Sequence, residues 1–168
     1  MTNKNILLID FSAITVANVL EFGDDIKNKS AQEMKGLLYH TIIKSILAYK
    51  KKFPKYSNVV IAADSRHSWR KDFFPLYKAN RKEKREQDAL DWNAVFEVIG
   101  QLENDIETMM PWKLLKVDKC EADDIIATVV KMNDSDFSPP DILIISSDKD
   151  FVQLHKYNNV RQISTKTK

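Results

Sequence analysis

Three short runs of branched apolar residues, each followed by aspartate, most strongly constrain how this chain folds. They are Ile6–Ile9, Val59–Ala63 and Ile142–Ser146. Strands buried on both faces have continuous apolar sequences of this kind, whereas half-buried strands alternate apolar and polar residues. The runs therefore predict a parallel sheet that is covered by helices. Weaker strand candidates are Trp112–Val117 and Val160–Ser164.

Helical patterns separate the predicted strands. Residues Ser30–Lys51 begin with the spacing of a capping box, and Gln87–Met109 and Ala122–Met132 have apolar positions at helical period. Asn133–Pro140 has the composition of a loop. The alternation of strands and helices predicts a three-layer α/β domain with a mainly parallel central sheet. Because the chain has no long linker and no internal repeat, we expect residues 1–168 to form a single domain.

Composition sets limits on the class of protein. The chain has 168 residues, of which 43% are apolar and 30% are charged, as in one ordinary globular domain. No apolar run approaches the roughly 20 residues of a membrane span, so we expect no membrane partner. The first apolar run ends at Asp10 and does not fit a signal peptide. A single cysteine, Cys120, rules out an internal disulfide and favours the cytoplasm.

Carboxylates gather at the ends of the strong strands. Asp10, Asp64 and Asp148 follow the three runs. In parallel α/β sheets, the carboxyl ends of the strands meet at the edge where ligands bind. Carboxylates that share this edge repel one another unless a cation neutralises them. Four more acidic residues lie nearby in the sequence: Glu121, Asp123, Asp124 and Asp150.

Each of these residues also has a simpler explanation. An aspartate after a strand often caps the following helix, and acidic residues in a first helical turn complement the helix dipole. One of Asp123 and Asp124 is expected to face solvent or a neighbouring basic group. The repetition of the pattern at every strong strand favours a shared metal site over separate caps.

The type of ligand indicates the type of metal. Carboxylate oxygens suit Mg²⁺ or Mn²⁺, and the histidines have no metal-binding spacing with one another or with Cys120. Several carboxylates can hold two such ions about 3.5–4 Å apart, an arrangement used to hydrolyse phosphodiesters. We therefore expect a divalent-metal centre with two ions.

A basic segment follows Asp64. Residues Arg66–Glu86 contain eight Lys or Arg against three Asp or Glu, interleaved with aromatic residues. Cations suit phosphates and aromatic faces suit unpaired bases, so the segment is typical of single-strand binding. The alternative is a solvated loop whose aromatic side chains lie in the core. The candidate nucleic-acid contacts are Arg66, Arg70, Lys71, Lys78, Arg81, Lys82, Lys84 and Arg85.

Lys78 and Arg81 are the preferred phosphate contacts in this segment. A helix that begins within Tyr77–Arg81 would present both cations on one face.

Five motifs together resemble one family. In chain order they are LLIDFS (7–12), AAD (62–64), YKANR (77–81), EADDIIA (121–127) and SSDKDFVQL (146–154). Their order resembles that of the flap endonuclease, or 5′-nuclease, superfamily, and is most similar to its bacteriophage RNase H branch. The combination of EADD with the later SSDxD is the specific part, and the resemblance extends over residues 5–163.

The resemblance implies a PIN-like fold and metal-dependent hydrolysis of phosphodiesters. The substrate would be DNA or an RNA–DNA hybrid with a free 5′ end or flap, cut during primer removal in replication. A phage-encoded protein would work in the host cytoplasm.

Residue roles follow from the motif matches. Asp10, Asp64, Asp123 and Asp148 resemble ligands of the first metal and Asp150 a ligand of the second, while Glu121 and Asp124 resemble neighbours that act directly or through water. Lys78 and Arg81 resemble catalytic residues that engage the scissile phosphate, within a helical arch at about residues 66–90.

The sequence departs from the family pattern at its end. Family members continue beyond the SSDxD motif with a further second-metal aspartate and a region that grips duplex DNA. Here no aspartate follows Asp150 up to Lys168. We therefore expect the duplex-binding region to be absent and full activity to need a missing segment or a second chain.

Three other interpretations are available for an acidic α/β domain, and the sequence argues against the first two. An aspartyl phosphatase needs DxDxT after its first strand, and a Toprim domain needs glutamate there, whereas this chain has Asp10-Phe11-Ser12. A non-catalytic nucleic-acid-binding or interaction subunit with an incomplete metal site would bind its partner without Mg²⁺-dependent cleavage.

Overall fold

A parallel sheet forms the centre of the molecule. The structure, a computed structural model, describes residues 5–27, 29–134 and 138–165, and for residues 82–84 and 86 it describes only the backbone. Within these ranges, five parallel strands lie in the order β3-β2-β1-β4-β5. The strands are β1 (Ile6–Asp10), β2 (Asn58–Ala63), β3 (Lys113–Lys116), β4 (Ile142–Ile145) and β5 (Val160–Ile163).

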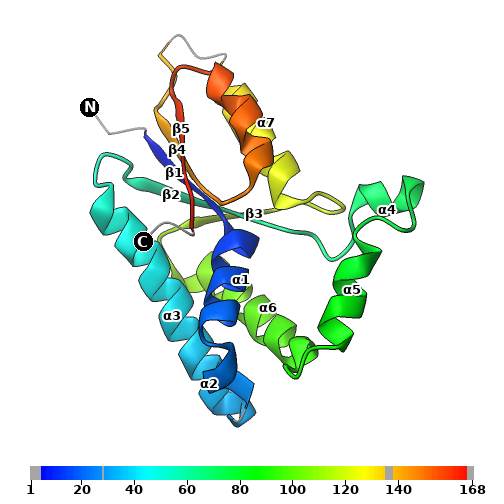
Figure 1. Cartoon of the computed structure of the whole chain (residues 1–168). Helices are drawn as coiled ribbons and strands as arrows, with labels where there is room; N and C mark the ends of the chain where they lie inside the picture. The colour runs from blue at the N-terminus through cyan, green and yellow to red at the C-terminus, as the bar shows by residue number, and fades with distance from the viewer. Residues whose placement is uncertain (1–4, 28, 135–137, 166–168) are drawn as a thin grey trace.

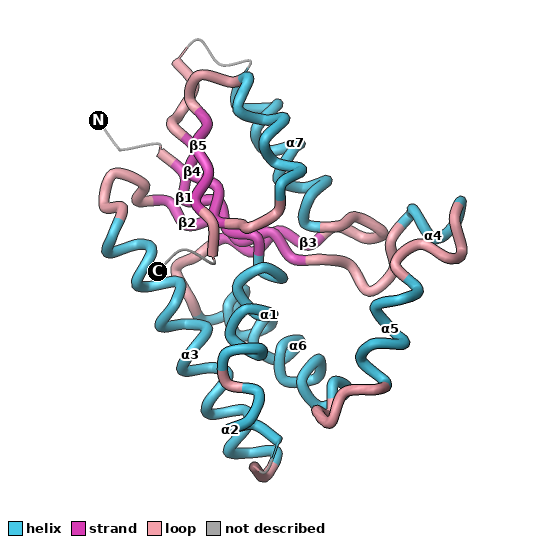
Figure 2. Tube along the Cα trace, viewed as in Figure 1, coloured by secondary structure: helices cyan, strands magenta, loops and turns pink. Residues whose placement is uncertain are grey.

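Helices cover both faces of the sheet (Figure 1). On one face lie α1 (Phe11–Glu21), α3 (Ala31–Lys52) and α6 (Trp92–Met109), with the short α2 (Gly23–Lys27) at their far end. On the other face lie α7 (Ala122–Asp134) and the 3-10 helix η1 (Lys149–Lys156). Figure 2 shows the same three layers by type of element. The expected three-layer α/β class is confirmed.

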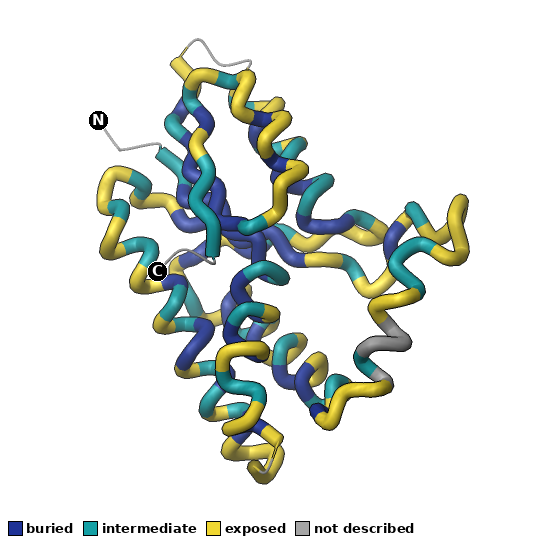
Figure 3. Tube along the Cα trace, in the orientation of Figure 1, coloured by how far each residue is buried: buried dark blue, intermediate teal, exposed yellow. Residues whose placement is uncertain are grey.

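The strands have an apolar core on each side. Leu7 and Ile9 of β1 pack into the larger cluster with α1, α3 and α6, while Leu8 packs into a second cluster with α7 and η1. All three leucine and isoleucine side chains have no exposed surface. Burial on both faces explains the continuous apolar runs in the sequence, and Figure 3 shows it along the strands.

The strand order creates a switch point beside β1. From β1 the chain adds β2 and β3 on one side and β4 and β5 on the other. Ligand sites of open α/β sheets form at the carboxyl ends of strands where the order reverses. Asp10 lies at this end of β1, and Asp148 follows β4.

The basic segment stands away from the body of the domain. It contains α4 (Trp69–Phe73) and α5 (Ala79–Glu86), which project to one side in Figure 1 before the chain returns to α6. Leu90, where the chain returns from this segment, is only 7% exposed and packs into the larger apolar cluster. This agrees with the expected helical arch.

Some element boundaries differ from the sequence predictions. The helix expected from Gln87 begins at Trp92, because the Asp91 carboxylate caps it by accepting hydrogen bonds from the N–H groups of Asn93 and Ala94. Helix α7 runs to Asp134, into the expected loop, and residues 135–137 of that loop lie outside the described residues. Helices α1, α2, α4 and η1 were not predicted.

The predicted strands and the predicted capping box are confirmed. All five strand candidates form strands, and the Ser30 side chain makes the capping box with Glu33. No helix in the described part of the chain is long and apolar enough to cross a membrane.

Candidate active site

Asp10 lies at the centre of the carboxyl edge of the sheet. One oxygen accepts a hydrogen bond from the Ala13 N–H at 3.0 Å and caps α1, and the other accepts one from the Ser146 hydroxyl at 2.7 Å. The side chain is buried, and burial raises the pKa of Asp10. The two hydrogen bonds oppose this shift, and the charges of Asp64 and Asp148 add to it.

Asp64 joins three elements at the same edge. It follows β2, and one oxygen accepts a hydrogen bond from the Ala122 N–H at the start of α7, at 2.7 Å. The other oxygen accepts one from the Ser12 hydroxyl of α1, at 2.5 Å. These bonds fix the carboxylate between helices on opposite faces of the sheet.

Asp148 caps the helix that follows its strand. Its Oδ1 accepts a hydrogen bond from the Asp150 N–H at 2.9 Å, at the start of η1. Asp10 and Asp148 are therefore both helix caps, as the simpler explanation predicted. Capping uses one oxygen of each carboxylate and holds the group at the sheet edge, so capping and ligand binding do not exclude each other.

Asp123 completes an acidic cluster that we define as Asp10, Asp64, Asp123 and Asp148. The pKa of Asp123 is raised to about 6, first by burial and then by the charges of Asp10 and Asp148, with a smaller contribution from Asp64. The charge of Lys78 opposes the shift. The neighbouring carboxylates of the cluster therefore destabilise the charged forms of Asp10 and Asp123, which is the expected property of a site for a cation.

The described acidic side chains are not arranged to bind a metal ion directly. Among residues 5–27, 29–134 and 138–165, no three His, Cys, Asp or Glu side chains have the arrangement that holds a metal ion directly. The hydroxyl and N–H donors described above hold several of the acidic oxygens. Magnesium usually keeps several waters and takes one or two carboxylates directly, so ligation through water fits this arrangement.

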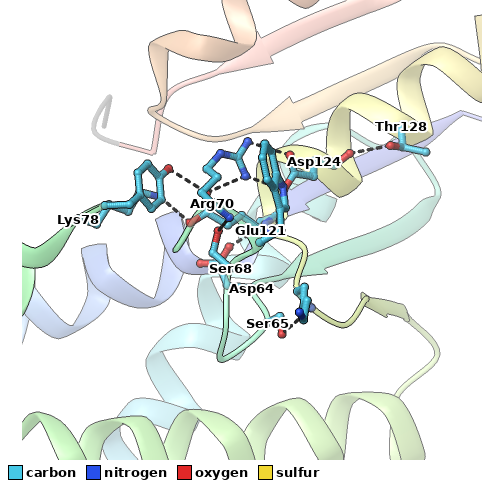
Figure 4. A network of polar contacts seen from close by, with 12 residues as sticks. Asp64, Ser65, Ser68, Arg70, Lys78, Glu121, Asp124 and Thr128 are labelled. Atoms are coloured by element: carbon cyan, nitrogen blue, oxygen red, sulfur yellow. Dashed lines mark hydrogen bonds and ion pairs between the residues drawn. The ribbon is translucent and has the colours of Figure 1, made fainter. Parts of the chain in front are cut away.

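Asp124 faces the arch instead of the acidic cluster (Figure 4). Arg70 binds both of its oxygens at 2.8 Å, and the Trp69 indole N–H donates to it at 3.3 Å. The hydrogen bonds from Arg70 lower the pKa of Asp124. This confirms that one of the two neighbouring aspartates faces a basic group.

Glu121 is also held by the arch. It is 8% exposed and accepts hydrogen bonds from Lys78 Nζ at 2.9 Å and from the Tyr77 hydroxyl at 3.0 Å. Arg70 lies 3.2 Å from the same carboxylate. Figure 4 shows this network between the arch and the start of α7. These three partners offset the cost of burying the Glu121 carboxylate.

Lys78 does not lie on a helix with Arg81, contrary to the sequence prediction. It has a left-handed backbone (φ 56°) one residue before α5 begins, which directs its side chain to Glu121. Burial alone would lower the pKa of Lys78, but hydrogen bonds with Glu121 and Tyr77 outweigh it and raise the pKa. Arg81 is exposed near Lys78, close enough for its charge to affect Lys78.

Three of the remaining predicted residues have exposed side chains. Asp150 is exposed in the first turn of η1, and Arg66 and Lys71 are also exposed. Arg85 packs over the Phe96 ring of α6, with 5.1 Å between the guanidinium carbon and the ring centre. The side chains of Lys82 and Lys84 lie outside the described residues.

Backbone bonds tie the base of the arch to the loop before α7. The N–H groups of Ser65 and Trp69 donate to the carbonyls of Cys120 and Lys119, both at 2.9 Å. The Lys119 N–H donates to the Ser65 hydroxyl at 3.1 Å. These bonds place the basic segment beside the acidic residues that open α7.

Sequence reasoning missed the hydroxyl groups of the site. Ser12 and Ser146 donate to Asp64 and Asp10, and Tyr77 donates to Glu121. All three lie inside quoted motifs, but short polar side chains next to a strand have too many ordinary roles to be assigned from sequence.

Comparison with known proteins identifies the family. A family model described as the 5′-3′ exonuclease, N-terminal resolvase-like domain matches residues 5–168. The chain belongs to this family. It is 40% identical to ribonuclease H of Enterobacteria phage T4 over 165 residues. The matched region covers 96% of this chain and 52% of the T4 protein, so the chain spans about half the length of this relative.

Solved structures share the fold of this exonuclease-family domain. The D15 protein of bacteriophage T5, co-crystallised with metal ions, matches with a TM-score of 0.70 and 22% identity, covering 96% of this chain and 55% of that chain. A complex of the T5 D15 flap endonuclease with DNA and metal ions matches with a TM-score of 0.71 and 21% identity, with the same coverage. Another T5 5′-exonuclease structure contains zinc.

These matches confirm the resemblance to the 5′-nuclease family and the PIN-like α/β fold. The roles of individual residues in the exonuclease-family domain remain predictions.

The raised pKa of Asp123 predicts a pH effect on stability. We expect Asp123→Asn to raise the free energy of unfolding at about pH 7.5 in EDTA by about 1 kcal/mol. This value is smaller than the pKa shift alone implies, because the side chain is only half-buried and solvent screens its charge. The folded state binds this proton more tightly than the unfolded chain does. The contribution of Asp123 therefore favours folding below about pH 4 and is lost as pH rises through about 6.

Urea unfolding of wild type and variant at several pH values between about 4 and 8 measures this difference. The exposed Asp25→Asn is the control, for which we expect little change. Parallel pH profiles for wild type and Asp123→Asn would contradict the proposed cluster.

Proposed function

We propose that this chain is the metal-dependent nuclease core of a 5′-nuclease. It would hydrolyse phosphodiesters at 5′ ends or flaps of DNA or RNA–DNA hybrids during primer removal in replication. The observation that carries the proposal is the acidic cluster at the switch point of the sheet, with Lys78 of the arch beside it. Membership of the 5′-3′ exonuclease family supports it.

The residues fit a divalent metal centre of Mg²⁺ or Mn²⁺. Asp10, Asp64, Asp123 and Asp148 offer hard oxygen ligands whose mutual repulsion a cation would relieve. Asp150 would contribute to a second ion, and Glu121 and Asp124 would act as neighbours, directly or through water. When bound, such ions supply an acidified water and stabilise charge on the phosphate and the leaving oxygen.

Lys78 and Arg81 would engage the scissile phosphate. Lys78 remains charged because its partners raise its pKa, and it lies between the arch and the acidic cluster. Arg81 is exposed on the first turn of α5 and is free of the Glu121 network. A cation placed at this boundary would offset the charge that develops on phosphate in the transition state.

The arch would bind the unpaired 5′ strand. Phe73 and Phe74 are 72% and 68% exposed, so these aromatic side chains are not tucked into the core as the alternative required. Exposed aromatic faces beside cations suit unpaired bases and phosphates. The contributing cations would be Arg66, Arg70, Lys71, Lys82, Lys84 and Arg85.

Binding to the duplex part of the substrate would come from a region beyond the matched residues, supplied by a further segment or a second chain. The T4 relative is about twice as long as the region that this chain matches. The host cytoplasm is the proposed location of a phage enzyme of this kind.

The test is cleavage of a 5′-labelled flap substrate with Mg²⁺, Mn²⁺ or EDTA. We expect cleavage with either metal and none in EDTA, because the acidic cluster alone repels phosphate. Calorimetry on the same preparation measures Mg²⁺ binding. Metal binding without cleavage would indicate that a further part is required, and no metal binding would contradict the proposed centre.

The second candidate is a nucleic-acid-binding subunit without catalytic activity. The ion pairs of Arg70 and Lys78 with Asp124 and Glu121 favour it, because they already neutralise two of the predicted acidic residues. Oligonucleotide binding that is equal in Mg²⁺ and EDTA, with no cleavage in either, is its expected result.

A further inference from the structure

The loop between β4 and η1 carries Asp148 and is held by a side chain of the edge strand. The Gln162 Nε2 group of β5 donates hydrogen bonds to the Ser146 carbonyl at 2.9 Å and to the Asp148 carbonyl at 2.7 Å. A primary amide has two N–H donors, and both are used here. One side chain therefore fixes the carbonyls on both sides of Ser147.

The same loop is fixed from the inside by a hydroxyl group. Ser146 is fully buried, donates to Asp10 at 2.7 Å and accepts from the Asp148 N–H at 3.1 Å. Asp10 and Asp148 are thus linked through one side chain. Rotation of the Ser146–Ser147 peptide would break the bond from Gln162, and rotation of the Ser147–Asp148 peptide would break the bond to the Ser146 hydroxyl.

The middle residue of the loop, Ser147, is bonded to the segment after β5. The Ser147 hydroxyl accepts from the Thr165 N–H at 3.1 Å and makes hydroxyl contacts with Thr165 at 2.5 Å and Ser164 at 3.1 Å. Every residue from Ser146 to Asp148 therefore contacts the end of β5 or the residues that follow it.

The contacts of Gln162 are not needed to pair the strands. Backbone bonds join β4 and β5 in register, and the Ser146 N–H donates to the Ile163 carbonyl at 3.1 Å. Glutamine has no special preference for strands, and this half-buried side chain adds little to the apolar core. Both hydrogen bonds described for the Gln162 side chain go to the loop that carries Asp148.

We propose that Gln162 is a positioning residue for the metal centre and acts through the Ser146–Asp148 loop. The inference rests on the proposed function, because it assumes that Asp148 contributes to a cation site. Groups that orient the ligands of a metal are typically worth 10–100-fold in affinity. By fixing two carbonyls of the loop, Gln162 keeps the Asp148 carboxylate beside Asp10 before any cation arrives.

The test measures Mg²⁺ affinity by calorimetry and thermal stability in EDTA for Gln162→Leu. We expect the affinity to fall roughly 10-fold or more, while the melting temperature in EDTA stays within a few degrees of wild type. The matched control is Asn159→Leu. Asn159 is also half-buried, and its amide donates to the Pro140 carbonyl at 2.8 Å, at the start of β5 instead of its end. Its Mg²⁺ affinity should equal that of wild type.

Gln162→Glu separates positioning from charge. An added carboxylate near the acidic cluster would by itself strengthen cation binding. Because glutamate has the same shape but cannot donate to either carbonyl, the positioning role predicts weaker Mg²⁺ binding instead. Tighter binding by Gln162→Glu would overturn the proposal.

The remaining outcomes are distinguishable. Wild-type affinity in Gln162→Leu would overturn the positioning role and leave the proposed function intact. No Mg²⁺ binding by wild type would overturn the proposed metal centre and this inference with it. If Gln162→Leu does not fold, Gln162→Thr, which suits a strand better, replaces it with the same expected loss.

Discussion

Asp148→Asn is expected to reduce Mg²⁺-dependent cleavage more than about 100-fold while the protein stays folded. Even outer partners of metal sites are worth roughly 10–100-fold, so removal of a ligand should cost more. Asparagine still accepts the hydrogen bond from the Asp150 N–H and therefore keeps the cap of η1. The substitution thus removes a charge from the acidic cluster and little else.

The measurements for Asp148→Asn are flap cleavage, Mg²⁺ calorimetry and thermal unfolding in EDTA. Because the charge of Asp148 raises the pKa of both Asp10 and Asp123, its loss should leave stability unchanged or increase it. Asp91→Asn is the matched control, since Asp91 caps α6 outside the acidic cluster. Equal cleavage by wild type and Asp148→Asn would refute the assignment of the cluster.

Lys78→Met is expected to lower the turnover of bound substrate by about 100-fold without a comparable loss of Mg²⁺ affinity. Removing one fixed donor that stabilises transition-state charge typically costs 10²–10³-fold in turnover. The Glu121 carboxylate keeps Tyr77 and Arg70 as partners in this variant, so the base of the arch should remain in place.

Lys71→Met distinguishes this effect from general attraction of phosphate. Lys71 is exposed on α4, so its loss should weaken binding modestly and reduce the salt dependence, with turnover at saturating substrate unchanged. Single-turnover kinetics at several salt concentrations separate the two effects. If Lys78→Met behaves like Lys71→Met, Lys78 does not act on the scissile phosphate.

The fold was largely predictable from sequence because strands that are buried on both faces have a recognisable apolar sequence pattern. Strands covered on both faces need continuous apolar residues, and all five candidates form strands. The acidic edge was predictable for a related reason. Parallel strands bring their carboxyl ends together, so Asp10, Asp64 and Asp148 had to meet once the sheet was parallel.

The polar contacts of the arch were not predictable in the same way. Whether Asp123 or Asp124 turns to the acidic cluster depends on where Arg70 lies, and that depends on the backbone bonds from Ser65 and Trp69 to the loop before α7. The left-handed backbone of Lys78 also has no local signal, because lysine rarely adopts it. Such features arise from tertiary contacts between distant segments.

The strand order also affects how the molecule forms. Ser146 and Asp10, which are joined by a hydrogen bond, are separated by 136 residues in the chain. Contacts across such long separations close slowly, because the entropy of the loop is lost before the contact forms. The acidic cluster therefore forms only once the distant strands β1 and β4 have paired. Repulsion in the completed cluster raises the free energy of the native state, so we expect substitutions that relieve the repulsion to make the folded protein longer-lived.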